Sequence, residues 1–60
     1  MKTETLKQME IEMKRLKQYF PYRIVIGAYN PTTQETQTMA VTTMREPNKL
    51  MRQGWEVYKL

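Results

Sequence analysis

The chain has 60 residues, of which ten are basic and six acidic, so its formal net charge is +4 at pH 7. It contains no His, Cys, Ser or Asp, the residue types that supply most nucleophiles, neutral-pH proton shuttles and metal ligands in proteins. This composition excludes a disulfide scaffold and predicts a non-enzymatic protein without metal or cofactor, whose function rests on surface recognition.

The length predicts a single small α+β domain over residues 1–60, with a core that supplies roughly 3–5 kcal/mol of net stability. Because disulfides and metals cannot reinforce this chain, we expect a homodimer or a tight complex with another protein. No apolar run approaches the roughly 20 residues of a transmembrane helix, and the charged N-terminal residues do not resemble a signal peptide. The sequence therefore predicts a cytoplasmic protein without membrane insertion.

The first predicted element is an amphipathic helix. Thr5 followed by Gln8 fits a capping box at its start, and Thr3 is a competing N-cap. Pro21 disfavours helical geometry at the preceding residue, so the helix is expected to end near Gln18 or Tyr19. One side of the helix carries an apolar stripe, formed by Leu6, Met9, Met13, Leu16 and Phe20.

This apolar stripe is predicted to be buried, because a lone helix of roughly 15 residues is marginal in water. Packing on the chain's own sheet is the favoured interpretation. Ile11 lies off the stripe and supports it, since it widens the apolar surface beyond a narrow seam. The alternatives are pairing with a helix of another molecule and binding of this basic amphipathic helix to an anionic membrane surface.

Two strands follow, over residues 22–29 and 36–43, where apolar and polar side chains alternate. Asn30 and Pro31 begin a turn between them, so we expect an antiparallel hairpin. In the second strand, Met39 and Val41 share one face. Gly27 in mid-strand predicts a bulge or a close approach of another backbone. A bend that lets the first helix pack against the sheet would explain it, and contact with a ligand is the alternative.

A short helix and a closing strand complete the predicted domain. Pro47 suits the first turn of this helix and Gly54 its C-terminal stop, with Leu50 and Met51 facing inward. Residues 55–60 alternate as a third strand beside the first, in which Trp55 is expected to be largely buried in the core. The predicted order is α-β-β-α-β, with a three-stranded antiparallel sheet and both helices on one face.

Residues 50–57 (LMRQGWEV) resemble the helix–Gly-Trp-Glu–strand ending of several small bacterial and phage domains. The resemblance implies structural roles only, in which Gly54 closes a helix and Trp55 fills a core. It identifies no family and implies no activity.

Surface recognition by this chain can involve protein or nucleic acid. The basic residues are spread along the sequence without a nucleic-acid-binding motif, and the six methionines suit adaptable apolar contacts. We therefore expect a small accessory or regulatory protein that acts by protein–protein binding, including self-association. Its size is typical of proteins that phages and mobile elements encode, such as an inhibitor of a host protein. The alternative is a sequence-tolerant nucleic-acid-binding protein that uses basic and aromatic side chains.

The candidate interface combines side chains expected on the exposed face of the sheet with others at the hairpin exit and in the last strand. Tyrosine and basic side chains there could contact a partner, and threonines could donate or accept hydrogen bonds beside them. The candidate interface residues are Arg23, Tyr29, Thr36, Thr38, Met44, Tyr58 and Lys59.

Overall fold

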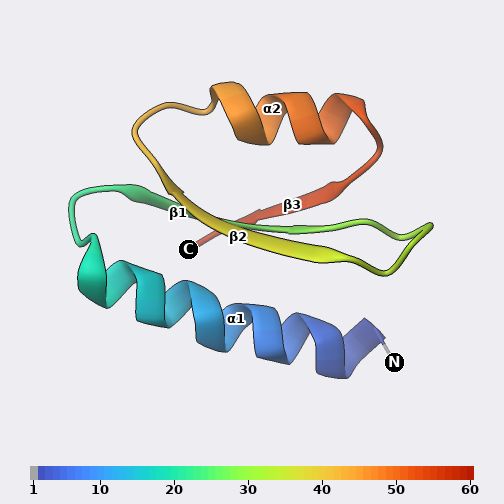
Figure 1. Cartoon of the computed structure of the whole chain (residues 1–60), viewed down its shortest axis with the longest axis horizontal. Helices are drawn as coiled ribbons and strands as arrows, with labels where there is room; N and C mark the ends of the chain where they lie inside the picture. Colours follow the sequence, from blue (N-terminus) through green and yellow to red (C-terminus); the bar gives the residue numbers. More distant parts are fainter. Residues whose placement is uncertain (1) are drawn as a thin grey trace.

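The structure, a computed structural model, describes residues 2–60 and contains two helices and three strands (Figure 1). In chain order these are α1 (Lys2–Tyr19), β1 (Ile24–Tyr29), β2 (Thr36–Val41), α2 (Arg45–Arg52) and β3 (Glu56–Lys59). The predicted α+β order α-β-β-α-β is thereby confirmed. None of the helices within residues 2–60 has the length and apolar character that crossing a membrane requires.

The sheet is antiparallel, with β1 at its centre and strand order β2-β1-β3. Gly27 in the middle of β1 lies opposite Thr38 of β2 and Tyr58 of β3. The predicted pairing of the third strand with the first is confirmed. Five consecutive residues of β1, from Val25 to Tyr29, are buried, because this strand has a neighbour on each side and a helix above and below.

The two helices cover opposite faces of the sheet, so the prediction that both lie on one face is wrong (Figure 1). α1 lies over β1 and β2, and α2 lies over β3 and β1. The physical reason is that β1 is apolar on both faces. Val25 and Tyr29 point to the α1 side and Ile26 and Ala28 to the α2 side, and all four are at most 4% exposed. A single layer of helices would leave two of these side chains in water.

The apolar stripe of α1 was predicted to be buried along its length, and the structure buries it at its centre but leaves Phe20 exposed. Met9 and Met13 form a buried cluster with Val25. Leu6 and Leu16 pack against this cluster while half-buried, and Phe20 lies beyond the end of the helix. The helix begins at Lys2 rather than at Thr5, with Glu4 in its first turn, where a negative charge is favourable.

Gly27 is the position at which α1 comes closest to the sheet. A Cβ atom at this residue would lie 2.6 Å from the Met13 sulfur and 2.9 Å from the Met9 sulfur, well inside van der Waals contact. The pairing of β1 is continuous through Gly27, so there is no bulge, and the atoms that come close are side-chain atoms of two methionines rather than another backbone. The expected result, that α1 packs against the sheet here, is confirmed.

Asn30 organises the turn between β1 and β2. Its side-chain oxygen accepts hydrogen bonds from the backbone N–H groups of Thr32 and Thr33, at 2.9 and 3.3 Å. Gln34 then adopts a positive φ of 64° and donates its N–H to the Asn30 carbonyl oxygen. This is the local hydrogen bonding for which asparagine is favoured in turns, as the sequence predicts.

α2 ends at a glycine, as predicted, but it buries less of its surface than expected. Gly54 has φ of +92°, and the next residue, Trp55, donates its N–H to the Leu50 carbonyl oxygen at 3.0 Å. Pro47 is the buried residue of the helix, whereas Met51 is half-exposed and does not face inward. Trp55 is only half-buried, so the largest fully buried side chains are Ile26, Val25 and Pro47 instead.

Candidate binding surfaces

The seven candidate interface residues do not form one surface. Tyr29 is only 4% exposed, because its side chain points to the face of the sheet that α1 covers. Its place on an exposed face was therefore wrongly predicted. Met44, at the start of α2, is half-buried.

The remaining candidates separate into three places. Thr36 and Thr38 lie on β2, at one edge of the sheet, whereas Tyr58 and Lys59 lie on β3 at the other edge. Arg23 is exposed in the connection between α1 and β1. A partner therefore has three distinct surfaces to contact: this connection, the β3 side and the β2 edge.

The connection between α1 and β1 displays three aromatic rings, and residues 19–23 are called the aromatic segment from here on. Tyr22 is 100% exposed, Tyr19 is 79% exposed and Phe20 is 39% exposed. Pro21 ends the helix within this segment, which turns the following residues away from the core. The rings are consequently presented to solvent.

Hydrogen bonds and a cation–π contact hold the aromatic segment in shape. The Phe20 N–H donates to the Leu16 carbonyl oxygen at 2.8 Å, and the Arg23 N–H donates to the Phe20 carbonyl oxygen at 3.1 Å. The guanidinium of Arg23 lies 5.1 Å from the centre of the Phe20 ring, and the Lys17 ammonium donates to the Arg23 carbonyl oxygen at 3.3 Å. Tyr19 and Tyr22 therefore lie on an ordered turn.

The net positive charge of the chain is concentrated around this segment. No acidic residue occurs between Glu12 and Glu35, and the other residues hold six basic and six acidic side chains, which cancel. The entire net charge of +4 therefore comes from the four basic residues of this stretch. They are Lys14, Arg15, Lys17 and Arg23.

Sequence reasoning missed this site because it counted the basic residues along the whole chain and found them spread. The usable signal was the absence of acidic residues around the run Tyr-Phe-Pro-Tyr-Arg. Within the stretch, Lys14 is the residue whose charge is locally balanced, since its ammonium lies 3.4 Å from the Glu10 carboxylate.

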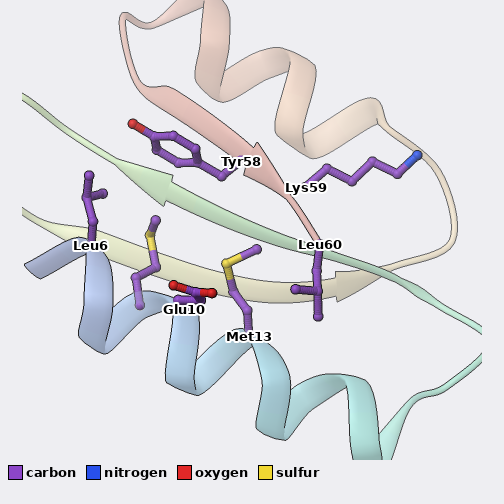
Figure 2. Close-up of a pocket in the computed structure, with 7 residues that line it drawn as sticks. Leu6, Glu10, Met13, Tyr58, Lys59 and Leu60 are labelled. Atoms are coloured by element: carbon purple, nitrogen blue, oxygen red, sulfur yellow. The ribbon is translucent and has the colours of Figure 1, made fainter.

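A groove of about 250 Å³ runs between α1 and β3 (Figure 2). It forms because α1 lies over β1 and β2, which leaves the adjoining face of β3 uncovered. Tyr58 and Leu60 point into the groove from the sheet, whereas Lys59 extends away from it (Figure 2). The hydroxyl of Tyr58 donates to the Glu56 carboxylate at 2.8 Å, which orients the ring as a wall of the groove. The lining residues are Leu6, Met9, Glu10, Met13, Tyr58, Lys59 and Leu60.

Within residues 2–60, no three His, Cys, Asp or Glu side chains gather as a metal site would require. No protein-family model, curated protein or solved structure matches the chain. The proposals below therefore rest on the geometry and charge of the described residues.

Proposed function

We propose that this chain is a non-enzymatic protein-binding domain that contacts its partner through the aromatic segment. The observation that carries the proposal is the pair Tyr19 and Tyr22, which are 79% and 100% exposed on an ordered turn beside Arg23. Tyrosine and arginine are among the side chains most enriched at the energetic centres of protein interfaces. Because a tyrosine has few rotatable bonds, burying it against a partner costs little conformational entropy.

The charge of the surrounding stretch indicates the kind of partner. Arg15, Lys17 and Arg23 are exposed near the segment, so an acidic protein surface would be attracted to it and oriented by it. The small size and the lack of catalytic residue types suit an accessory or regulatory role in the cytoplasm. An inhibitor of a host protein, encoded by a phage or mobile element, is a role of this kind.

Affinity capture with matched variants tests the proposal. The tagged chain, a Tyr19→Ala/Tyr22→Ala variant and an Ile11→Ala control are each incubated with nuclease-treated lysate of the source cells. Ile11 is a half-exposed apolar residue of α1 outside the segment, so its substitution controls for general stickiness. We expect a discrete protein to be retained by the wild type and the control and lost with the double tyrosine variant.

Capture of the same protein by the double tyrosine variant would contradict the proposal. Circular dichroism of each variant confirms that the fold is unchanged, which is expected because both tyrosines are exposed. A loss of capture can then be assigned to the missing rings.

The same segment favours one second candidate, sequence-tolerant binding of single-stranded nucleic acid. Bases can stack on exposed tyrosines while Lys17 and Arg23 contact phosphates. This candidate ranks second because nucleic-acid sites track several phosphates with positive charge, and this stretch provides four basic residues, of which Lys14 is paired with Glu10.

Salt dependence distinguishes the second candidate from the first. With a fluorescent single-stranded oligonucleotide, each neutralised phosphate contributes about 0.7 to the slope of log affinity against log salt. Replacing Lys17 and Arg23 with Gln should therefore lower the slope by about 1.4. An unchanged slope, or no binding at low salt, would eliminate nucleic acid as the ligand of this segment.

A further inference from the structure

β2 is an edge strand with none of the usual protection against pairing with another strand. Its outer side has no neighbour among the strands of residues 2–60, and residues 36–43 contain no charged residue and no proline. Natural edge strands are commonly protected by charged side chains, proline or bulges. β3, the other edge, is shorter and carries Glu56 and Lys59. The unprotected edge is therefore β2.

The hydrogen-bond alternation of the hairpin identifies the groups that β2 offers outward. The Asn30 N–H donates to the Glu35 carbonyl oxygen at 2.9 Å, so residues 35, 37, 39 and 41 direct their main chain toward β1. The N–H and C=O groups of Thr36, Thr38 and Ala40 consequently point away from the sheet. These groups can form backbone hydrogen bonds with a further strand.

The position of α1 indicates which strand can pair with the outer edge of β2. α1 lies over both β1 and β2. An axis midway between these two strands would lie about half a strand spacing inside the β2 edge. If a second copy adds its own β2 at the usual spacing of about 4.8 Å, the two α1 helices come to lie about 10 Å apart. This matches the 8–10 Å between packed helices.

We propose that two copies of this chain pair antiparallel through their β2 edges, forming a six-stranded sheet with the two α1 helices side by side on one face. With the two-fold axis beside Met39, the outward Thr38 of each copy pairs with Ala40 of the other. The absence of charge in residues 36–43 means that no like charges oppose one another across this axis. This interface does not rest on the function proposed for the aromatic segment.

The same axis brings complementary charges on α1 together. Met9 and Met13 both lie over Gly27, which pairs with Thr38, so residue 11 of α1 is level with Thr38. One strand residue further, at Met39, the helix has advanced by about two residues, to residue 13. By this arithmetic Glu12 of each copy lies within about one residue rise of Arg15 of the other, which their long side chains can span.

The oligomeric state of edge variants tests this interface. Sedimentation equilibrium is measured for the wild type, for Thr36→Lys/Gln37→Lys on the edge, and for Met51→Lys/Gln53→Lys at the C-terminal end of α2. All four positions are exposed and both variants add two positive charges. The comparison therefore tests the location of the added charge. We expect a mass of twice 7.3 kDa for the wild type and the α2 control, and a dissociation constant raised at least tenfold for the edge variant. A wild type that stays at 7.3 kDa at millimolar concentration would overturn the proposal, as would an edge variant that dimerises like the wild type.

Two further variants test the pairing geometry. Thr38→Pro removes an N–H that points outward, so it should weaken the dimer while circular dichroism shows the hairpin retained. Glu12→Arg should weaken the dimer by like-charge contact with Arg15 of the other copy, and Glu12→Arg/Arg15→Glu should restore it. Dimerisation that is unaffected by Thr38→Pro would place the interface elsewhere, and failure of the double charge exchange to restore it would contradict the side-by-side helices.

Discussion

At the scale of single residues, Gly27 shows how closely α1 packs against the sheet. A side chain at this position would collide with two methionine sulfurs of α1 at once. The backbone of Gly27 does not need the conformational freedom of glycine, because its φ is not positive. Its role is to leave room for α1.

Gly27→Ala should lower the free energy of unfolding by about 1–3 kcal/mol, because Met9 and Met13 must shift from their packed positions. Urea unfolding measures this change. Combining it with Met13→Ala provides the control, since the second substitution removes the closest obstruction. The combined cost is expected to be smaller than the sum of the two single costs. Strict additivity would show that the added methyl group does not meet Met13.

Two tyrosines give a matched comparison of exposure. Tyr22 is 100% exposed and Tyr29 is 4% exposed, so the same change to alanine should cost very different amounts of stability. Tyr22→Ala should leave the free energy of unfolding within about 0.5 kcal/mol of wild type. Tyr29→Ala should cost about 3–5 kcal/mol, which is comparable to the net stability of a domain this small. Chemical denaturation followed by circular dichroism distinguishes them, and equal effects would contradict the assigned burial.

At the scale of elements, hydrophobic periodicity predicts the two helices and three strands well. The 3–4 spacing of Leu6, Met9 and Met13 defines α1, and alternation defines the strands. Gly54 marks the end of α2 because helices commonly close with a glycine at positive φ. The start of α1 was placed too late, since Thr5 and Thr3 are both good capping residues by type but lie within a helix that already begins at Lys2.

The helix faces could not be predicted by the same reasoning, because alternation in β1 was taken to mean one buried and one solvated face. The run Ile-Val-Ile-Gly-Ala-Tyr is nearly continuous in apolar residues, which is typical of a strand covered on both faces. This signal was present in the sequence. Giving it precedence would have placed one helix on each face and Tyr29 in the core.

The two sides of α1 provide a test of its packing. Met13→Glu places a charge without a partner in the buried cluster and should prevent stable folding. Ile11→Glu, on the half-exposed side of the same helix, should change the free energy of unfolding by no more than about 0.5 kcal/mol. Thermal unfolding of both variants checks the expectation. Similar melting temperatures would show that the apolar stripe is not the packed face.

At the scale of the whole molecule, the chain exposes more surface than its mass requires. A monomer of 7.3 kDa is expected to expose about 4,200 Å², whereas this one exposes 4593 Å². The candidate site was harder to predict than the fold, because the exposure of each side chain depends on how the elements pack. The sequence lists aromatic and basic residues, but only the fold determines that Tyr29 is covered while Tyr19 and Tyr22 project from a turn.

Self-association should make thermal stability depend on concentration. For a dimer through the β2 edges, Tm should rise with protein concentration, because assembly stabilises the folded state by mass action. Each additional kcal/mol of stabilisation should raise Tm by roughly 4–8 °C in a domain of this size. The Thr36→Lys/Gln37→Lys variant should lose this dependence. A wild-type Tm that is constant over a hundredfold concentration range would show that folding and assembly are not linked.

The central claim is that a protein partner contacts the aromatic segment, and mapping that contact on the chain tests it most directly. The isotope-labelled chain is titrated with the protein recovered by affinity capture, and backbone amide shifts are followed by NMR. We expect the largest perturbations at residues 17–23, with Tyr22 among them. Perturbations centred on Tyr58 and Leu60 in the groove, or on Thr36 and Thr38 at the β2 edge, would contradict the claim and assign the partner to another surface.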